Sequence, residues 1–155
     1  MFLLGSCSID VQRSLPYICY ELKRNLTISI TKMIKILLID DTTEFRDEIK
    51  DILLMEGYKV STASNGYNGI EAAIDFLPDL IVTDLDMPEM DGYGLISMIK
   101  TNAQLKNIPI LVLSANVEKE FIRKAILLKA DCFITKPCSA NELIESIDNM
   151  LLIRA

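Results

Sequence analysis

The sequence predicts an α/β protein in which a parallel β-sheet lies between two layers of helices. Three observations lead to this fold class. Short runs rich in Ile, Leu and Val alternate with longer segments of helical periodicity. The runs are continuously apolar, which is typical of strands buried on both faces. Four of them also end in a polar residue, as expected where parallel strands open onto a shared edge.

Five strands and five helices are expected in alternation. The strands are predicted at residues 35–39, 59–62, 80–83, 110–113 and 131–135. The helices are predicted at about residues 43–55, 66–76, 93–101, 118–128 and 140–152. This alternation specifies a doubly wound three-layer sandwich of the flavodoxin-like kind, with strand order 2-1-3-4-5.

Turn residues and apolar faces justify these elements in order. The first helix stops at Gly57, a residue that suits a helix C-terminus. Its one apolar face is formed by Phe45, Ile49, Ile52 and Leu53. Pro78 ends the connection into the third strand, and Pro109 introduces the fourth. The closing helix again has an apolar stripe, formed by Leu143, Ile144, Ile147 and Leu151.

The residues that follow four of the strands carry groups suited to phosphate or metal chemistry. Asp40 and Asp41 follow the first strand, Asp84 the third, Ser114 the fourth and Lys136 the fifth. Because the carboxyl ends of parallel strands meet along one edge, three carboxylates, a hydroxyl and an ammonium should share one pocket. Strands one and three are neighbours in the predicted order, so Asp40, Asp41 and Asp84 should lie at the switch point of the sheet.

Each of these residues, taken alone, also has an ordinary structural explanation. Asp41 is typical of a helix N-cap, and Lys136 of a solvated surface lysine. Together, however, the three carboxylates repel one another by about 4 kcal/mol per close pair at an effective dielectric of about 20. Such a cluster requires a cation among the carboxylates or protonation of one of them. Oxygen ligands without His or Cys favour a hard ion such as Mg²⁺.

Composition and charge exclude several classes of function. The 155 residues suffice for one domain and a short extension. A net charge of −6 argues against non-specific nucleic-acid binding. The sequence contains no histidine, which excludes a Ser-His-Asp triad, a Cys-His pair and a histidine phosphocarrier. The four cysteines lack CxxC spacing, and we expect them to be reduced thiols. No apolar stretch reaches the roughly 18 residues that span a bilayer, so we expect a cytoplasmic protein.

The first 32 residues differ from the remainder of the chain. They carry a net charge of +2, whereas residues 33–155 carry −8. They show no clear periodicity, and the pattern of a complete domain begins at Met33. We therefore expect residues 1–32 to be an N-terminal extension, either a non-native start-site overcall or a disordered tether, and residues 33–155 to be the domain. The alternative is an extra strand packed on that domain.

Four motifs occur in a fixed order along the predicted domain. They are ILLIDD at 36–41, TDLDMPEMDG at 83–92, LSA at 113–115 and Lys136-Pro137. In order and spacing they resemble the motifs of response-regulator receiver domains of two-component signal transduction. The resemblance covers about residues 33–153, and it is to the chemotaxis-regulator type, a stand-alone receiver.

The resemblance implies a phosphoacceptor and a metal site. Asp84 would be the phosphoacceptor, a carboxylate nucleophile that attacks a phosphohistidine of a partner kinase. Asp40 and Asp41 would hold Mg²⁺, joined by the Asp84 carboxylate and the backbone carbonyl of Asp86. The side chain of Asp86 would either approach the phosphoryl group or point to solvent.

The resemblance also implies residues that bind the phosphoryl group and respond to it. Ser114 would donate a hydrogen bond to it, and Lys136 would pair with another of its oxygens. The Lys136–Pro137 peptide bond would be cis, which an X–Pro bond allows at modest cost. Phe133 falls at the family's aromatic switch position, with an ordinary core residue of a buried strand as the alternative.

The resemblance thus implies a phosphorylation-dependent signalling switch rather than an enzyme. A sensor histidine kinase or a histidine phosphotransfer protein would donate the phosphoryl group, with Mg²⁺ as cofactor. Because the chain ends directly after the closing helix, output would pass through a downstream protein target, without direct nucleic-acid binding or membrane insertion. One alternative is a haloacid-dehalogenase-like phosphatase, since Asp84-Leu85-Asp86 fits its DxD motif. The other is a receiver-fold adaptor that works without phosphorylation.

Overall fold

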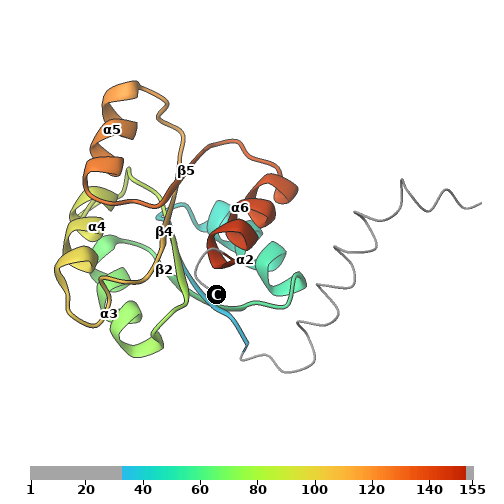
Figure 1. The fold of residues 1–155 in the computed structure, drawn as a ribbon. Helices are drawn as coiled ribbons and strands as arrows, with labels where there is room; N and C mark the ends of the chain where they lie inside the picture. The colour runs from blue at the N-terminus through green and yellow to red at the C-terminus, as the bar shows by residue number, and fades with distance from the viewer. Residues whose placement is uncertain (1–32, 153–155) are drawn as a thin grey trace, which may run out of the picture. The chain divides into compact units, whose positions relative to one another are not determined.

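The computed structural model describes residues 33–152, which form a five-stranded sheet covered by helices on both faces (Figure 1). The strands are β1 Lys35–Ile39, β2 Lys59–Ala63, β3 Leu80–Thr83, β4 Ile110–Ser114 and β5 Cys132–Thr135. The helices are α2 Thr43–Met55, α3 Gly66–Phe76, α4 Gly92–Thr101, α5 Lys119–Leu127 and α6 Ala140–Leu152. The predicted alternation of strands and helices is confirmed.

The sheet has the predicted topology. Its strands are all parallel and are ordered β2-β1-β3-β4-β5. The chain winds outward from β1 to β2 and then crosses back, so that β1 and β3 are neighbours with Leu38 opposite Val82. The residues that follow β1 and β3 therefore flank the switch point of the sheet.

The observed element ends differ from the predicted ones by at most one residue. α4, for example, begins at Gly92 rather than Tyr93 because Asp91 is its N-cap. The Asp91 carboxylate accepts a hydrogen bond from the Gly94 N–H at 2.8 Å. α5 begins at Lys119, with the predicted first residue, Glu118, at its N-cap position.

Alternate residues of the strands point to opposite faces of the sheet and form two separate cores. Leu37 and Ile39 belong to the core covered by α3, α4 and α5, whereas Ile36 and Leu38 belong to the core covered by α2 and α6. All four side chains are at most 1% exposed. Burying an aliphatic side chain of this size contributes about 1.5–3 kcal/mol, so these cores stabilise a sheet whose edge carries clustered charge.

The described residues contain no helix that is both long and apolar enough to cross a membrane. They belong to one compact unit, Met33–Ala155. The expectations for residues 1–32 concern a segment outside the described residues and stay predictions.

Candidate functional site

Three aspartates meet at the carboxyl edge of the sheet, on either side of the switch point. Asp40 directly follows β1, and its N–H donates to the Ala63 carbonyl at 3.1 Å. Asp84 directly follows β3, and its N–H donates to the Ile39 carbonyl at 3.0 Å. These bonds continue the parallel ladder past the strand ends and fix both backbones. Together with Asp41, each offers a carboxylate oxygen, and the three oxygens lie within 4.8 Å of one another.

A lysine that follows β5 lies between two of these carboxylates. The Lys136 Nζ donates to Asp40 Oδ2 at 2.6 Å and to Asp84 Oδ2 at 2.9 Å. The Phe45 ring of α2 faces the same ammonium, with 4.1 Å between Nζ and the ring centroid. The Lys136 N–H donates to the Ser114 carbonyl at 2.8 Å, which sets the lysine beside the end of β4. Two carboxylates and an aromatic face thus hold the ammonium.

Burial and the lysine have opposite effects on Asp84. Burial raises the pKa of the Asp84 carboxyl above its ordinary value, while the hydrogen bond and charge of Lys136 and the Leu85 N–H act against this rise. The nearby Asp40 charge raises the pKa further. Burial alone would lower the pKa of Lys136, but its hydrogen bonds to Asp40 and Asp84 raise it above the ordinary lysine value. The site therefore keeps the lysine charged and disfavours a full set of ionised carboxylates.

The donor set at this edge fits a hard divalent cation. When ionised, Asp40, Asp41 and Asp84 carry three negative charges, and Lys136 supplies one positive charge among them. A single divalent ion would balance the difference. The group contains only carboxylate ligands, and oxygen ligands favour Mg²⁺ or Ca²⁺ over softer metals. Asp40 is 1% and Asp84 8% exposed, whereas Asp41 is open to solvent, so access is on the Asp41 side.

The second carboxylate oxygen of Asp84 faces the loop that follows β3. The Leu85 N–H donates to Asp84 Oδ1 at 2.6 Å, and the Asp86 N–H reaches the same oxygen at 3.4 Å. The Gly92 N–H closes the loop by donating to the Leu85 carbonyl at 2.9 Å. A Cβ at Gly92 would collide with the Asp84 carbonyl oxygen, so only glycine lets α4 begin this close to the edge.

The remaining predicted site residues lie at β4 and β5. Ser114 is the last residue of β4 and is fully buried, and its hydroxyl oxygen accepts a hydrogen bond from the Asn116 N–H at 3.2 Å. Phe133 lies on β5 opposite Val112 and packs, partly buried, against the core covered by α3, α4 and α5. The structure thus brings Asp40, Asp41, Asp84 and Lys136 together, with Ser114 at the adjacent strand end and Phe133 in the core.

The observed contacts exclude two of the ordinary structural explanations. The N-cap of α2 is Thr42 rather than Asp41, and no side chain makes a capping hydrogen bond there. The Lys136 side chain is 15% exposed and bound to two carboxylates, so it is not a solvated surface lysine. The Asp86 side chain is exposed, and the Lys136–Pro137 peptide bond is cis.

Two residues of α2 contribute contacts that the sequence did not suggest. Phe45 was expected only as part of an apolar helix face, yet its ring faces Lys136. Arg46 Nη1 donates to the Asp40 carbonyl at 2.6 Å, and the Thr42 N–H donates to Asp40 Oδ1 at 2.8 Å. These residues lie within about two helical turns after Asp40, and proximity in sequence to the acidic pair is the signal that could have identified them.

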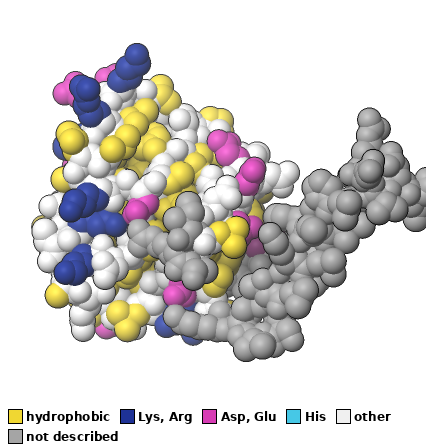
Figure 2. Space-filling model, viewed as in Figure 1, with side chains coloured by type: hydrophobic (Ala, Val, Ile, Leu, Met, Phe, Trp, Pro, Cys, Tyr) yellow, Lys and Arg dark blue, Asp and Glu magenta, His cyan; other side chains and the backbone are white. Residues whose placement is uncertain are grey.

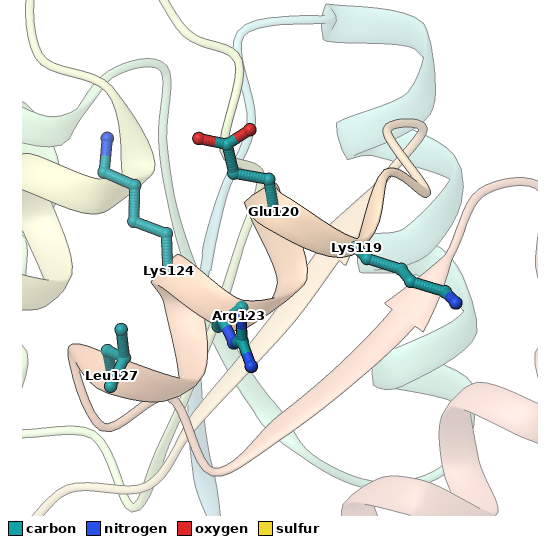
Figure 3. Close-up of a pocket in the computed structure, with 5 residues that line it drawn as sticks. All are labelled: Lys119, Glu120, Arg123, Lys124 and Leu127. Carbon is teal, nitrogen blue, oxygen red and sulfur yellow. The ribbon is translucent and has the colours of Figure 1, made fainter.

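A separate surface feature lies on α5. The described part of the chain has a shallow surface pocket on this helix (Figure 3). Its lining residues all belong to α5 and are Lys119, Glu120, Arg123, Lys124 and Leu127. Lys124 Nζ lies 3.9 Å from the centroid of the Tyr93 ring, which links α5 to α4. Ile126 and Leu127 are 60% and 76% exposed. Figure 2 shows basic and hydrophobic side chains close together over this part of the molecule.

Comparison with known proteins gives consistent matches over the described residues. The family model described as "Response regulator receiver domain" matches residues 36–148. Chemotaxis protein CheY from Bacillus subtilis is 37% identical over 119 residues, which cover 76% of this chain and 97% of that protein. Hybrid signal transduction histidine kinase D from Dictyostelium discoideum is 34% identical over 119 residues, 77% of this chain but 8% of that protein. Similar sequences therefore form nearly all of one relative and a small part of another.

A solved structure supports the same conclusion about the fold. Chemotaxis response regulator CheY4 of Vibrio cholerae superimposes with a TM-score of 0.72 at 27% sequence identity. The match covers 76% of this chain and 98% of that chain. The flavodoxin-like topology predicted from the sequence is confirmed by this likeness as well as by the strand order.

Proposed function

Since this chain belongs to the response regulator receiver domain family of two-component signalling, we propose that it is a phosphorylation switch with Asp84 as the phosphoacceptor. One observation carries the proposal. The Asp84 carboxylate follows the middle strand of the sheet, accepts a hydrogen bond from Lys136 at 2.9 Å and lies beside Asp40 and Asp41. A nucleophile, a fixed cation and a set of metal-binding oxygens thus occupy one small volume.

The proposed chemistry is transfer of a phosphoryl group from a phosphohistidine of a partner protein. A carboxylate oxygen of Asp84 bonds to phosphorus as the phosphorus–nitrogen bond breaks, and the imidazole leaves with that electron pair and takes a proton from water. Such transfer depends on charge neutralisation and in-line positioning more than on covalent machinery. Lys136 brings positive charge to Asp84 Oδ2, while the Leu85 N–H holds Oδ1 at 2.6 Å.

Asp40, Asp41 and Asp84, with the backbone carbonyl of Asp86, are the groups that would hold Mg²⁺. When bound, this ion would supply positive charge to the phosphoryl oxygens. The excess of negative charge among the three carboxylates supports the assignment, because one lysine does not balance it. The chain's own contribution is to keep Asp40 oriented through the Thr42 N–H at 2.8 Å.

Ser114 and Phe133 are the proposed switch residues. The Ser114 oxygen accepts the Asn116 N–H, which leaves the hydroxyl proton available for a phosphoryl oxygen. A phosphoryl group that binds Ser114 in one conformation of β4 would shift the population toward that conformation. β5 pairs with β4 at Val112 and Phe133, so the change would reach the partly buried aromatic ring.

We assign output to a downstream protein target that contacts the face made by α5, β5 and α6. α5 supplies the basic residues Lys119, Arg123 and Lys124 beside Leu127 (Figure 3). Ile126 on the same helix is also exposed, and this combination suits an amphipathic acidic partner. Titration with beryllofluoride and Mg²⁺ should shift amide resonances in β5 and α5 as well as at the acidic edge. Shifts confined to the acidic edge would exclude this coupling.

A sensor histidine kinase or a histidine phosphotransfer protein is the proposed phosphodonor, and the cytoplasm the proposed location. The net charge of −6 supports output through protein rather than nucleic acid. Cys132 and Cys138 are both free thiols, which agrees with a reducing compartment. The receiver domain is proposed to be residues 33–155, so a chain that lacks residues 1–32 should keep the phosphorylation rate of the full chain.

Acetyl phosphate with Mg²⁺ provides the direct test of the proposed function. The full chain should gain one acid-stable, base-labile phosphoryl group, measured by intact mass and by Phos-tag gel. Asp84→Asn should gain none, whereas Asp51→Asn, at an exposed position on α2 outside the site, should be labelled like the wild type. Undiminished labelling of Asp84→Asn would overturn the assignment. Continuous release of phosphate from many substrates would instead favour the phosphatase, and a wild type that takes up no phosphoryl group would favour the adaptor.

A further inference from the structure

The loop of residues 85–91, between β3 and α4, carries backbone groups that surround the proposed phosphoacceptor. The N–H groups of Leu85 and Asp86 both face Asp84 Oδ1, and the Asp86 carbonyl belongs to the proposed metal ligands. Leu85 is 1% exposed and is anchored in the core, whereas Pro88 and Glu89 farther along the loop are exposed. The position of the loop backbone therefore bears directly on the geometry around Asp84.

Glu89 has an unusual backbone conformation in this loop. Its φ is +68°, in the left-handed region that a residue with a Cβ occupies at a cost of about 1–2 kcal/mol. Such a conformation persists only where the surroundings determine it, and it is found preferentially at functional sites. The surrounding contacts therefore indicate what holds the loop in place.

The contacts come from the N-terminus of α3, which lies beside α4 on the same face of the sheet (Figure 1). Asn65 Nδ2 donates to Glu89 Oε2 at 3.1 Å, and the Gly66 N–H donates to the Met90 carbonyl at 3.2 Å. A Cβ on Gly66 would lie 2.8 Å from that carbonyl oxygen, too close for any other residue without movement. The loop and the start of α3 are thus in direct backbone contact.

Asn65 uses both ends of its amide in this arrangement. Its Oδ1 accepts from the Asn68 N–H at 2.8 Å and so caps α3, while its Nδ2 donates to Glu89. Asn65 is 8% exposed, so these partners satisfy a nearly buried polar group. An aspartate would cap the helix equally well but could not donate to Glu89. Capping and loop attachment are therefore separable by substitution.

We propose that the Asn65–Glu89 hydrogen bond is a clamp that positions the loop of residues 85–91 for Mg²⁺ binding and for phosphorylation of Asp84. The inference rests on the proposed function. Asn65 and Glu89 are positioning residues that act through the backbone of Asp86 and Leu85, since neither belongs to the group of carboxylates at the edge. Partners that orient metal ligands typically change metal affinity or activity by about 10–100-fold when they are removed.

The test exchanges the donor and the acceptor of the clamp in the full chain. Asn65→Asp keeps the helix cap but sets a carboxylate against Glu89, so the Mg²⁺ affinity and the rate of phosphorylation by acetyl phosphate should each fall on the order of tenfold. Glu89→Gln keeps an acceptor for Asn65 and should stay within about twofold of the wild type. In the double variant the introduced amide donates to the introduced carboxylate, which should restore both quantities to within about threefold.

Mg²⁺ affinity is measured by calorimetry without a phosphodonor, and melting temperature is recorded for all four proteins. An Asn65→Asp variant with wild-type affinity and rate would overturn the clamp. A defect that the second substitution fails to repair would also overturn it, since the loss would then come from α3 itself. Failure of the proposed function is distinct, because the wild type would then show no label on Asp84.

Discussion

At the amino edge of the sheet, carboxylates are matched with N–H donors at strand starts, whereas at the carboxyl edge one lysine pairs with two of three clustered carboxylates. Asp79 accepts from the Lys35 N–H at 2.9 Å at the start of β1. Asp131 accepts from the Ile110 N–H at 2.9 Å and pairs with Lys100 at 3.1 Å. These groups fasten strand ends. The carboxyl edge instead keeps an excess of negative charge, and this excess distinguishes the proposed functional edge from the amino edge.

The cation at each edge provides the largest expected contrast. Lys136→Ala removes the positive charge shared by Asp40 and Asp84, so phosphorylation by acetyl phosphate should slow by roughly 100-fold, as when a preorganised electrostatic group is lost. Lys100→Ala removes the same charge at the amino edge and should leave that rate unchanged. Time courses measured by intact mass check both. Equal effects of the two substitutions would show that only overall charge matters.

The next largest difference between the two edges is expected in Mg²⁺ affinity. Asp41→Asn removes one carboxylate charge from the group of three, so Mg²⁺ affinity should fall by about tenfold or more, measured by calorimetry. Stability without metal should hold or rise, because repulsion among the carboxylates is reduced. Asp40 is a poorer choice for this experiment because it also accepts the Thr42 N–H and the Lys136 ammonium.

Removing a carboxylate from the amino edge should lower stability, in contrast to Asp41→Asn at the carboxyl edge. Asp79→Ala leaves the Lys35 N–H without its carboxylate partner, so the free energy of unfolding should fall by about 1–3 kcal/mol. Mg²⁺ affinity should not change, because the residue lies at the far end of β3 from Asp84. Urea unfolding measured for Asp79→Ala and Asp41→Asn together checks the contrast. A loss of similar size in both would remove the distinction between the edges.

The pH dependence of stability gives the smallest expected effect. The pKa of Asp84 is raised in the folded state, so this group favours folding most below its unfolded pKa near 3.8 and loses that contribution as pH rises through the folded pKa. Asp84→Asn behaves like the neutral acid at every pH. The variant should therefore melt above the wild type at about pH 7, with a difference that shrinks toward about pH 3. A constant difference across this range would contradict the role of Asp84 ionisation.

Much of the fold could be predicted because local hydrophobic pattern identifies the buried strands, and their alternation with helices restricts the possible strand orders. The run 80–83 is buried on both faces, as its almost entirely apolar composition predicts. The gathering of Asp40, Asp84 and Lys136 at one edge also follows from parallel topology alone. Once the strands are known to be parallel, the residues that meet at the carboxyl edge can therefore be predicted from the sequence.

The contacts that could not be predicted depend on side-chain direction and on loop conformation. Phe45 fitted an apolar helix stripe, and only the structure shows that its ring faces the Lys136 ammonium. Glu89 has no sequence signal for a positive φ, since glycine or asparagine is the usual residue there. Its bond to Asn65 joins segments 24 residues apart, a distance at which local pattern carries no information.

Reductive trapping of the acyl phosphate identifies which aspartate of the chain carries the phosphoryl group. Borohydride converts a phosphorylated aspartate to homoserine, which peptide mass spectrometry then locates in the wild-type chain after treatment with acetyl phosphate and Mg²⁺. We expect homoserine at position 84 alone, with Asp40, Asp41 and Asp86 unchanged. Homoserine at another aspartate, or phosphoryl label that borohydride does not remove, would contradict it.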